Sequence, residues 1–241
     1  MNIDNIYRKY IKDEVSTVTL LSGGHINKTY LIETDAGNYI CQCINKCMDI
    51  DLLENNYRLY SEACERNARE YPKILKSEEG SYFVTDNDGD KWRMYPVIEG
   101  EVLTNPLSEA ELYECGKGLA RMHEILSSVS AKPDAVYPHL HDLEFYYEKY
   151  KRLINNSGTP ENEINSEPED SREAEPDNKR DNDLEILIDK RYMEIPYYKA
   201  QCTDVIHGDA KLANILFRAG KAVAFIDFDT VMMGSRFEDI A

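Results

Sequence analysis

Residues 205–230, VIHGDAKLANILFRAGKAVAFIDFDT, hold the densest set of chemically capable side chains in this sequence. Two short apolar runs, 205–206 and 222–226, are each long enough for a buried strand, and each is followed directly by polar residues. These polar residues are Asp209, Lys211 and Asn214 after the first run and Asp227 after the second. Phosphoryl transfer needs a carboxylate that orients an attacking hydroxyl, oxygen ligands for Mg²⁺ and a cation near the transferred group. The spacing supplies all three, which predicts a phosphotransferase site.

The same stretch has a simpler interpretation, in which a strand, a turn and a second strand use Asp and Asn only to form the turn. The ordered set is longer than the short motifs that match by chance, and this length favours the catalytic interpretation. The remaining elements are therefore considered as the frame that positions residues 205–230.

The elements ahead of this stretch follow from the spacing of apolar residues. Helical spacing predicts helices over residues 2–12 and 51–68. Apolar runs bounded by turn residues predict strands over residues 18–21, 28–34, 38–44, 71–76, 81–85 and 91–98. Because the strand pattern ends at residue 98, the predicted organisation is a sheet-rich lobe over 1–98, a hinge at 99–101 and a second lobe over 102–241.

A glycine turn between the first two predicted strands is a candidate phosphate-binding loop. It contains Gly23 and Gly24, followed by the side-chain donors His25 and Asn27. Glycines let the backbone approach an anion closely and direct N–H groups at it. A hairpin loop without any ligand fits the same residues, and only the position upstream of residues 205–230 favours a nucleotide role.

The second lobe is predicted to begin with a core helix. Ser108 and Glu111 form a capping box, and apolar residues recur behind it at helical spacing. His123 lies on this helix without a partner motif, so a structural role is the expectation. His139 and His141 are two residues apart and read as part of a loop that leads into a helix over 143–153, not as a metal site. A further helix is expected over 184–195.

Composition and charge narrow the classes of function. The chain has 241 residues, 42% of them hydrophobic, and can bury a substantial core. Its net charge of −17 argues against nucleic acid or an anionic membrane as a partner. No apolar run reaches the roughly 20 residues of a membrane helix, and residues 1–10 lack the apolar segment of a signal peptide. Six cysteines without a metal-ligand spacing predict reduced thiols in a cytoplasmic protein.

Residues 155–183 differ in kind from the rest of the sequence. They contain ten acidic and three basic residues and almost no apolar ones, so this segment contributes −7 to the net charge. Such a composition cannot bury enough surface to offset the entropy of ordering, which predicts a disordered acidic insertion. The remaining charge says little about the substrate.

The motif His207-Gly208-Asp209-x-Lys211-x-x-Asn214, together with Asp227-Phe228-Asp229, resembles the protein-kinase-like superfamily. Gly208 after the histidine is similar to the small-molecule branch, which includes aminoglycoside, choline and homoserine kinases. Shorter runs across the chain resemble N-acetylhexosamine 1-kinases and their relatives. Those runs are Gly24-His25-Ile26-Asn27-x-Thr29-Tyr30, Gln42-x-Ile44-Asn45, Trp92-Arg93-Met94-Tyr95 and Asp227-x-Asp229-Thr230-Val231-Met232.

The resemblance implies an α+β, two-lobed protein-kinase-like fold. It consists of a small antiparallel β-sheet N-lobe that binds nucleotide and a mainly helical catalytic C-lobe that would be truncated at residue 241. The implied reaction is transfer of the ATP γ-phosphate to the anomeric hydroxyl of an N-acetylhexosamine, with Mg²⁺. Two departures from the hexosamine-kinase pattern, Cys43 and Gly208, leave the sugar open.

The resemblance also assigns roles to individual residues. Asp209 would orient or deprotonate the acceptor hydroxyl and Lys211 would steady the γ-phosphate. The remaining assignments are Asn214 and Asp227 for the metal, His141 and Asp229 for the substrate, and Gly23, Gly24, His25, Asn27, Gln42 and Val97 for the nucleotide. Val97 would contact the base through its main chain.

Gln42 stands where kinases have a phosphate-contacting strand lysine. Three explanations stay open: the branch tolerates glutamine, nucleotide affinity is reduced, or Lys46 reaches in from the strand end. Three functions therefore remain, namely a sugar 1-kinase, another small-molecule kinase, and a catalytically weak kinase-like binding protein. The oligomeric state is not predicted.

Overall fold

The computed structural model describes residues 3–21, 27–104, 108–155, 182–194 and 202–240. These residues belong to two compact units, Met1–Leu140 with Cys202–Ala241, and His141–Gln201. Gly23, Gly24 and His25, and residues 156–181 of the predicted acidic insertion, lie outside the described residues. The division into lobes at residues 99–101 stays a prediction.

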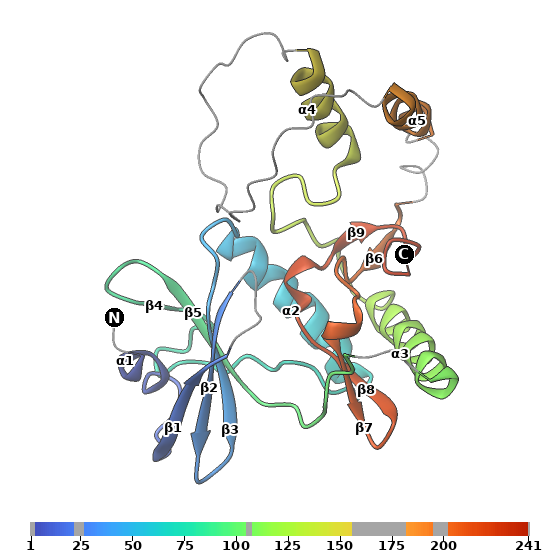
Figure 1. Cartoon of the computed structure of the whole chain (residues 1–241). Helices are drawn as coiled ribbons and strands as arrows, with labels where there is room; N and C mark the ends of the chain where they lie inside the picture. The colour runs from blue at the N-terminus through green and yellow to red at the C-terminus, as the bar shows by residue number, and fades with distance from the viewer. Residues whose placement is uncertain (1–2, 22–26, 105–107, 156–181, 195–201, 241) are drawn as a thin grey trace. The chain divides into compact units, whose positions relative to one another are not determined.

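An antiparallel five-stranded sheet forms the N-terminal part of the first unit (Figure 1). Its strand order is β1-β2-β3-β5-β4, and each neighbouring pair is antiparallel. The strands are β1 (Val15–Leu20), β2 (Lys28–Thr34), β3 (Asn38–Cys43), β4 (Val84–Thr85) and β5 (Lys91–Pro96). The expected strands over 18–21, 28–34, 38–44 and 91–98 therefore correspond to β1, β2, β3 and β5.

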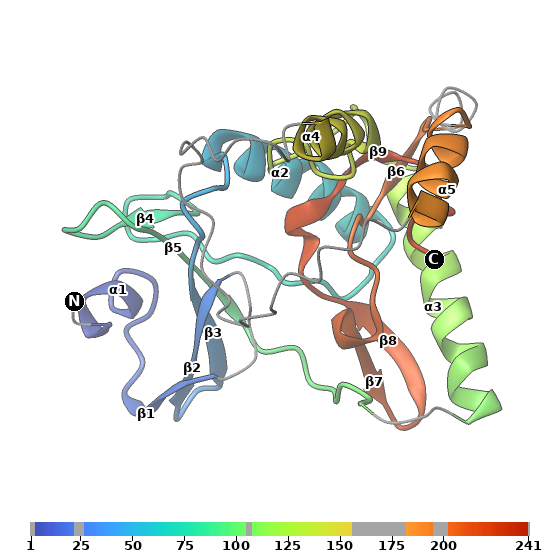
Figure 2. The same ribbon diagram turned by 45° about the horizontal axis from the view of Figure 1, so that its top comes forward.

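Two helices lie on opposite faces of this sheet (Figures 1 and 2). Helix α1 (Asp4–Tyr7) packs on one face of the sheet, here called the outer face. On this face the apolar side chains of Ile32, Cys41 and Met94 have no exposed surface. Helix α2 (Ile50–Arg66) contributes to the larger core on the other side, and Asp49 caps its first turn. Because strand side chains alternate between faces, Gln42 and Arg93 belong to the inner face that α2 covers.

One of the expected strands is wrong, and another is shorter than expected. Residues 71–76 form no strand, and only Leu75 donates a backbone hydrogen bond to Met94 of β5. Pro72 has no N–H to donate, and Tyr71 and Ile74 are buried in the main core instead of alternating across a sheet. The expected strand over 81–85 is reduced to the two residues of β4. The first helix is likewise shorter than predicted, because α1 has only four residues.

The rest of the first unit contains the motif from His207 to Asn214 and the segment from Asp227 to Asp229. Helix α3 (Glu109–Leu126) begins with the predicted capping box between Ser108 and Glu111. It packs against the hairpin of β7 and β8, and a second antiparallel pair joins β6 to β9. The elements of this region are β6 (Asp204–Ile206), η1 (Leu212–Asn214), β7 (Ile215–Arg218), β8 (Lys221–Phe225), η2 (Phe228–Thr230) and β9 (Met232–Gly234).

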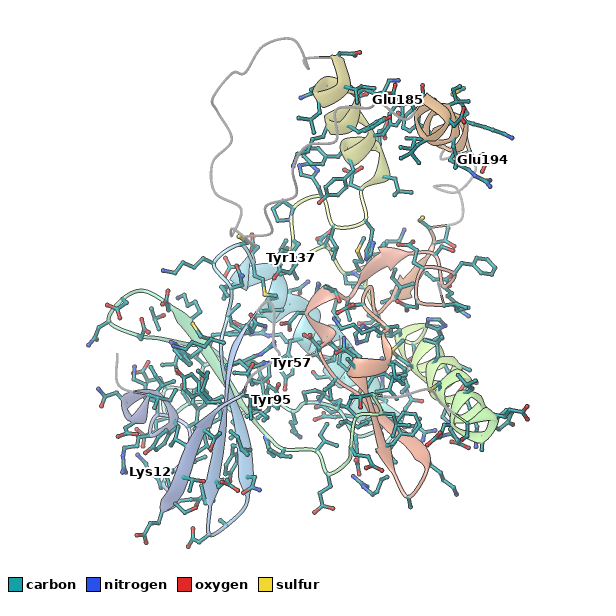
Figure 3. All side chains as sticks on the ribbon, viewed as in Figure 1. Lys12, Tyr57, Tyr95, Tyr137, Glu185 and Glu194 are labelled. Carbon is teal, nitrogen blue, oxygen red and sulfur yellow. The ribbon has the colours of Figure 1, made fainter. Side chains whose placement is uncertain are left out.

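Tyrosines contribute unusually much to the core between α2 and its neighbours. Tyr57 of α2 and Tyr95 of β5, both labelled in Figure 3, pack in the same cluster. Tyr60, one turn beyond Tyr57, stacks on Phe228 of η2 with ring centroids 4.6 Å apart. Large aromatic rings of this kind bury much apolar area, so they hold α2 against the segment that follows Asp227.

The second unit contributes helices α4 (Leu143–Asn155) and α5 (Asn182–Tyr192). They correspond to the helices expected over 143–153 and 184–195. Tyr147 of α4 stacks on Tyr192 of α5 with ring centroids 3.5 Å apart, and Lys151 pairs with Asp189. Within the described residues of the whole chain, we find no helix with the length and apolar content needed to cross a bilayer.

No disulfide joins any of the six cysteines, all of which the structure describes. Cys41 and Cys64 are buried, and burial raises the pKa of each thiol to about 12. These two side chains therefore act as small apolar core residues, as expected.

Candidate active site

The loop after β6 is fixed by hydrogen bonds to the side chain of Asp239. The backbone N–H of His207 donates to Asp239 Oδ2 at 2.9 Å, and that of Gly208 donates to Asp239 Oδ1 at 2.8 Å. His123 of α3 contacts the same carboxylate, with 2.9 Å between Nε2 and Oδ2. Burial by itself raises the pKa of Asp239, but the hydrogen bonds from His123 and the two N–H groups hold it below its ordinary value. The expectation of a structural role for His123 agrees with this contact.

His207 joins the two halves of the motif. Its side chain is fully buried, and its Nε2 lies 3.1 Å from the carbonyl oxygen of Ile226, the residue before Asp227. Thr230 in turn donates its hydroxyl to the carbonyl oxygen of His207 at 2.9 Å. Burial lowers the pKa of His207, so the ring is held as a neutral connector.

Glycine is required at position 208 by the backbone. Its φ of +78° is disfavoured for other residues, and a Cβ there would lie 2.4 Å from the carbonyl oxygen of Thr230. The departure at Gly208 is therefore explained by how closely the two loops of the site approach each other.

Asp209, Lys211 and Asn214 come together as their spacing predicts. Lys211 Nζ lies 2.6 Å from Asp209 Oδ2. The side-chain amide of Asn214 donates to the Asp209 backbone carbonyl at 2.9 Å and to Asp209 Oδ2 at 3.2 Å. These contacts fix the direction of the Asp209 carboxylate. They also turn the amide nitrogen of Asn214 towards Asp209, which leaves its amide oxygen available as a metal ligand.

Asp227 has the most unusual environment of the site. It adopts a left-handed backbone conformation with φ +65° and ψ +60°. We find no hydrogen-bond donor to its carboxylate among the residues that the structure describes. Burial, reinforced by the nearby charge of Asp229, raises its pKa from 3.8 to about 6. A divalent cation held by this carboxylate and the Asn214 amide oxygen would compensate this partly buried charge, so the donor set fits Mg²⁺.

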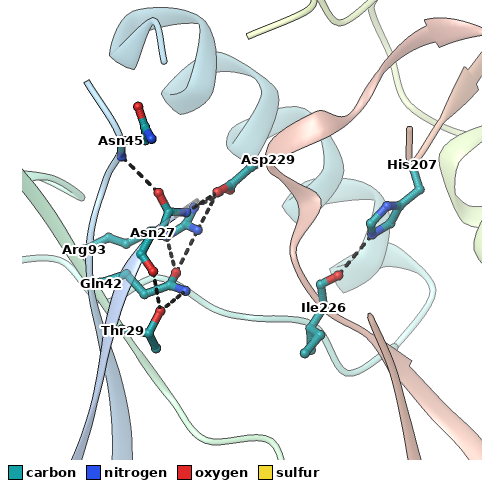
Figure 4. A network of polar contacts seen from close by, with 8 residues as sticks. All are labelled: Asn27, Thr29, Gln42, Asn45, Arg93, His207, Ile226 and Asp229. Atoms are coloured by element: carbon teal, nitrogen blue, oxygen red, sulfur yellow. Dashed lines mark hydrogen bonds and ion pairs between the residues drawn. The ribbon is translucent and has the colours of Figure 1, made fainter. Parts of the chain in front are cut away.

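Asp229 is placed differently from its prediction as a substrate contact. Only 3% of the residue is exposed, and its carboxylate is paired with Arg93 of β5. Asn27 donates to the same carboxylate at 3.0 Å (Figure 4). A role in contacting the acceptor does not fit this geometry, because both carboxylate oxygens already accept hydrogen bonds inside the protein.

Three explanations were open for a glutamine at position 42 in place of the strand lysine. The contacts of Gln42 and Lys46 exclude one of them, the approach of Lys46 from the strand end. Gln42 donates to the hydroxyl of Thr29 at 3.1 Å and accepts from Arg93. Lys46 does not reach in, because its ammonium lies 2.8 Å from Asp90 and its side chain is 78% exposed. Most polar atoms of Asn27 and Gln42 thus form hydrogen bonds inside the protein, and the contacts of these two residues with a nucleotide stay predictions.

The segment after β5 limits how Val97 can contact a base. The backbone N–H of Val97 already donates to the carbonyl oxygen of Asn38 at 2.8 Å, and Pro96 has no N–H. Base contacts from this segment would therefore use carbonyl oxygens or the N–H of Ile98. The predicted hinge at 99–101 is tied to β7, because Glu101 and Phe217 exchange two backbone hydrogen bonds. His141 belongs to the other unit, and its role stays a prediction.

Arg93 and Asp239 join segments of the site through buried contacts, but no role could be assigned to them from the sequence. Arg93 did carry a signal, since an arginine between Trp92 and Met94 of an apolar strand needs a buried partner. Asp239 lies 30 residues beyond Asp209 in the sequence, and no local pattern connects the two.

A match to a protein-family model shows which family the chain belongs to. Residues 17–241 match the model of the phosphotransferase enzyme family. The chain belongs to this family. Several solved structures have a similar fold: an amicoumacin kinase in complex with AMP-PNP and Ca²⁺ has a TM-score of 0.63 at 14% identity. A spectinomycin phosphotransferase in complex with ADP and spectinomycin has a TM-score of 0.59 at 13% identity, and an ADP-bound aminoglycoside phosphotransferase 0.60 at 16%.

These alignments cover 98–99% of this chain and 66%, 70% and 73% of the respective solved chains. The chain thus spans about two thirds of the length of the structures it matches. At such low identity the likeness is one of fold. It confirms the predicted α+β, protein-kinase-like fold with an antiparallel N-terminal sheet followed by helices.

Proposed function

We propose that this phosphotransferase is a kinase that transfers the γ-phosphoryl group of ATP to a hydroxyl group of a small molecule, with Mg²⁺. The observation that carries the proposal is the pairing of two unlike carboxylates. Asp209 is oriented by Lys211 and Asn214, whereas Asp227 is partly buried without a hydrogen-bond donor among the described residues. Kinase chemistry needs one carboxylate for the acceptor and another for the metal.

The roles follow from the surroundings of each group. Asp209 orients the acceptor hydroxyl and takes its proton as the acceptor oxygen bonds to the γ-phosphorus and the bond to the ADP oxygen breaks. Lys211 lies next to Asp209 with its side chain 54% exposed, so its ammonium can also reach the transferred group. Asn214 and Asp227 would hold Mg²⁺, which neutralises charge on the phosphates when it is bound.

The proposed nucleotide site lies on the inner face of the sheet. Residues 1–98 would form the nucleotide-binding lobe, 99–101 the hinge and 102–241 the catalytic lobe. Gly23, Gly24 and His25 remain candidate phosphate contacts, and Val97 a candidate base contact through its carbonyl oxygen. The nucleotides bound in the solved structures of similar fold support ATP as the phosphoryl donor.

The proposed acceptor is the anomeric hydroxyl of an N-acetylhexosamine. Support comes from the residue runs that resemble N-acetylhexosamine 1-kinases, which extend from Gly24 to Met232. His141 remains a candidate for the acceptor pocket. A second candidate function is a catalytically weak binding protein, which is favoured by Gln42 in place of a strand lysine.

A panel of acceptors with Mg-ATP tests the proposal. N-acetylglucosamine, N-acetylgalactosamine, choline, homoserine and an aminoglycoside are each incubated with the protein, ADP release is followed, and the product is identified by phosphorus NMR. The expected product is a hexosamine 1-phosphate. Phosphorylation of another acceptor alone would replace the acceptor class, and calorimetry that detects no Mg-ATP binding would favour the binding protein.

Asp209→Asn provides the mechanistic control. Loss of the base is expected to lower the rate by about 10²–10⁴-fold. Asp204→Asn is the matched control, because Asp204 lies on β6 just ahead of the loop and pairs with Arg236 outside the site. Full activity of the Asp209→Asn protein would contradict the mechanism.

A further inference from the structure

Arg93 and Asp229 form a buried ion pair that connects the sheet to the segment carrying Asp227 (Figure 4). Arg93 Nη1 donates to Asp229 Oδ1 at 2.5 Å, and Nη2 donates to Asp229 Oδ2 at 2.7 Å. The two side chains are 5% and 4% exposed. Paired N–H groups of this kind fix both the distance and the plane of the carboxylate.

The sheet register prepares Arg93 for this contact. Arg93 of β5 lies opposite Gln42 of β3, and Gln42 Oε1 accepts from Arg93 Nε at 2.9 Å and from Nη2 at 2.8 Å. Four of the five guanidinium N–H groups are therefore used by Gln42 and Asp229. An arginine so nearly saturated and so deeply buried is held in place and is not free to bind phosphate. Burial lowers the pKa of Arg93, but the neighbouring Asp229 raises it by more, so the guanidinium group stays charged.

Asn27 connects a third strand end to the same carboxylate. Its amide nitrogen donates to Asp229 Oδ2 at 3.0 Å, and its amide oxygen accepts from the backbone N–H of Asn45 at 2.9 Å. Asp229 is thereby joined to the start of β2, to β5, and through Asn45 to the chain after β3. Only one residue, Phe228, separates it from Asp227.

Helix α2 does not supply the carboxylate that protein kinases pair with a strand lysine. Its Glu54 pairs with Arg58 at 2.6 Å on the same helix, and Glu62 is exposed. The helix contacts the Asp227 segment by other means, since Asn56 donates to the carbonyl oxygen of Val231 at 3.1 Å.

We propose that Arg93, Asp229, Gln42 and Asn27 form a positioning unit that holds the Asp227 segment against the sheet, in place of the strand lysine and helix glutamate of protein kinases. Arg93 and Asp229 are positioning residues in this unit, because they act on the site through Asp227 and do not contact the nucleotide. In this unit Gln42 is the acceptor that aligns Arg93. This inference rests on the proposed function, since the unit positions the metal ligand of that site.

The test replaces the pair by apolar residues of similar size. Breaking a buried pair on one side only leaves an uncompensated charge, whereas apolar replacement of both partners is often tolerated. The variant is Arg93→Met with Asp229→Leu, and its matched control is Lys12→Met with Glu78→Leu, an exposed ion pair of the same unit (Lys12 is labelled in Figure 3). Calorimetry measures ADP affinity once with Mg²⁺ and once with EDTA, and thermal melting reports folding.

The wild-type protein and the control are expected to bind ADP more tightly with Mg²⁺ than with EDTA. In the Arg93/Asp229 variant, the improvement of ADP affinity by Mg²⁺ is expected to be smaller by about 10-fold or more, while the affinity in EDTA is unchanged. Residues that support metal ligands change metal affinity by about this factor. Arg93→Lys, which keeps the charge but not the two-point contact, should lose part of the gain and serves if the double variant does not fold.

Two results would overturn the inference. An Arg93/Asp229 variant, or an Arg93→Lys protein, that keeps the full Mg²⁺ gain would show that the pair does not position Asp227. An equal loss of ADP affinity with EDTA and with Mg²⁺ would show direct phosphate binding by Arg93. A wild-type protein that binds no ADP under either condition would instead contradict the proposed function.

Discussion

Replacing Asp227 with Asn is expected to stabilise the ligand-free protein while removing a ligand of the proposed metal. The carboxylate is partly buried, and no donor to it is found among the described residues, so its ionised form is disfavoured in the fold. Asn has nearly the same shape, carries no charge and tolerates the left-handed conformation found at this position. The substitution therefore removes the unfavourable charge with little change in packing.

The magnitude follows from the pKa of Asp227, which is about 6 in the fold and has an ordinary value of 3.8. The folded state holds the proton more tightly, so ionisation lowers the free energy of unfolding as pH rises through this range. With these two values, the penalty is about 3 kcal/mol near pH 7.5 and about 1 kcal/mol near pH 4.5. The stabilisation by Asp227→Asn should therefore shrink as the pH falls.

Urea unfolding in EDTA at these two pH values measures the effect. Asp209→Asn is the control, because the Asp209 carboxylate accepts from Lys211 and Asn214 and its removal should not stabilise the protein. A second readout is the melting temperature in a Mg²⁺ titration, which should rise for the wild-type protein but not for Asp227→Asn.

Two outcomes would refute the reasoning. An Asp227→Asn protein no more stable than wild type near pH 7.5 would mean that the carboxylate is compensated in the ligand-free protein. A gain of equal size at both pH values would assign the effect to the backbone preference of Asn, since that preference does not depend on protonation.

Two further substitutions test the frame of the site. Gly208→Ala should lower the free energy of unfolding by more than about 2 kcal/mol in urea titrations, because a positive φ and contact with Thr230 act together. Gly80→Ala, with a similar φ of +81° but no atom within 4 Å of its Cβ, should lose only about 1 kcal/mol, and equal losses would exclude the close approach. Asp239→Asn should destabilise the protein by about 2–4 kcal/mol near neutral pH, because one carboxylate serves His123 and two N–H groups. Since the pKa of Asp239 is lowered in the fold, this loss should diminish as the pH falls through that pKa, and a constant loss would assign it to shape alone.

The parts of the site that the sequence predicted are those with short-range spacing. Asp209, Lys211 and Asn214 lie within six positions, so the loop that joins β6 to η1 is enough to bring them together. The capping box of α3 is local in the same way, because Ser108 and Glu111 contact each other across one turn.

The partners contributed by distant strands could not be predicted in this way. Arg93 meets Asp229 across 136 positions, and this contact depends on the strand order that places β5 beside β3. Residues 71–76 show the opposite error, because apolar content alone predicted a strand. The buried side chains Tyr71 and Ile74 pack into the core beside α2, and Pro72 interrupts the hydrogen bonding that a strand requires.

Trp92, the single tryptophan of the chain, lies on the outer face of the sheet directly beside Arg93 in the sequence. It is 1% exposed, and its indole N–H donates to Asp86 at 3.0 Å. Its fluorescence therefore reports on one site only, the contact between α1 and β5, while the chain's 17 tyrosines are spread over both units. Selective excitation of the indole would follow the opening of the N-terminal sheet separately from events in α4 and α5, without any introduced label.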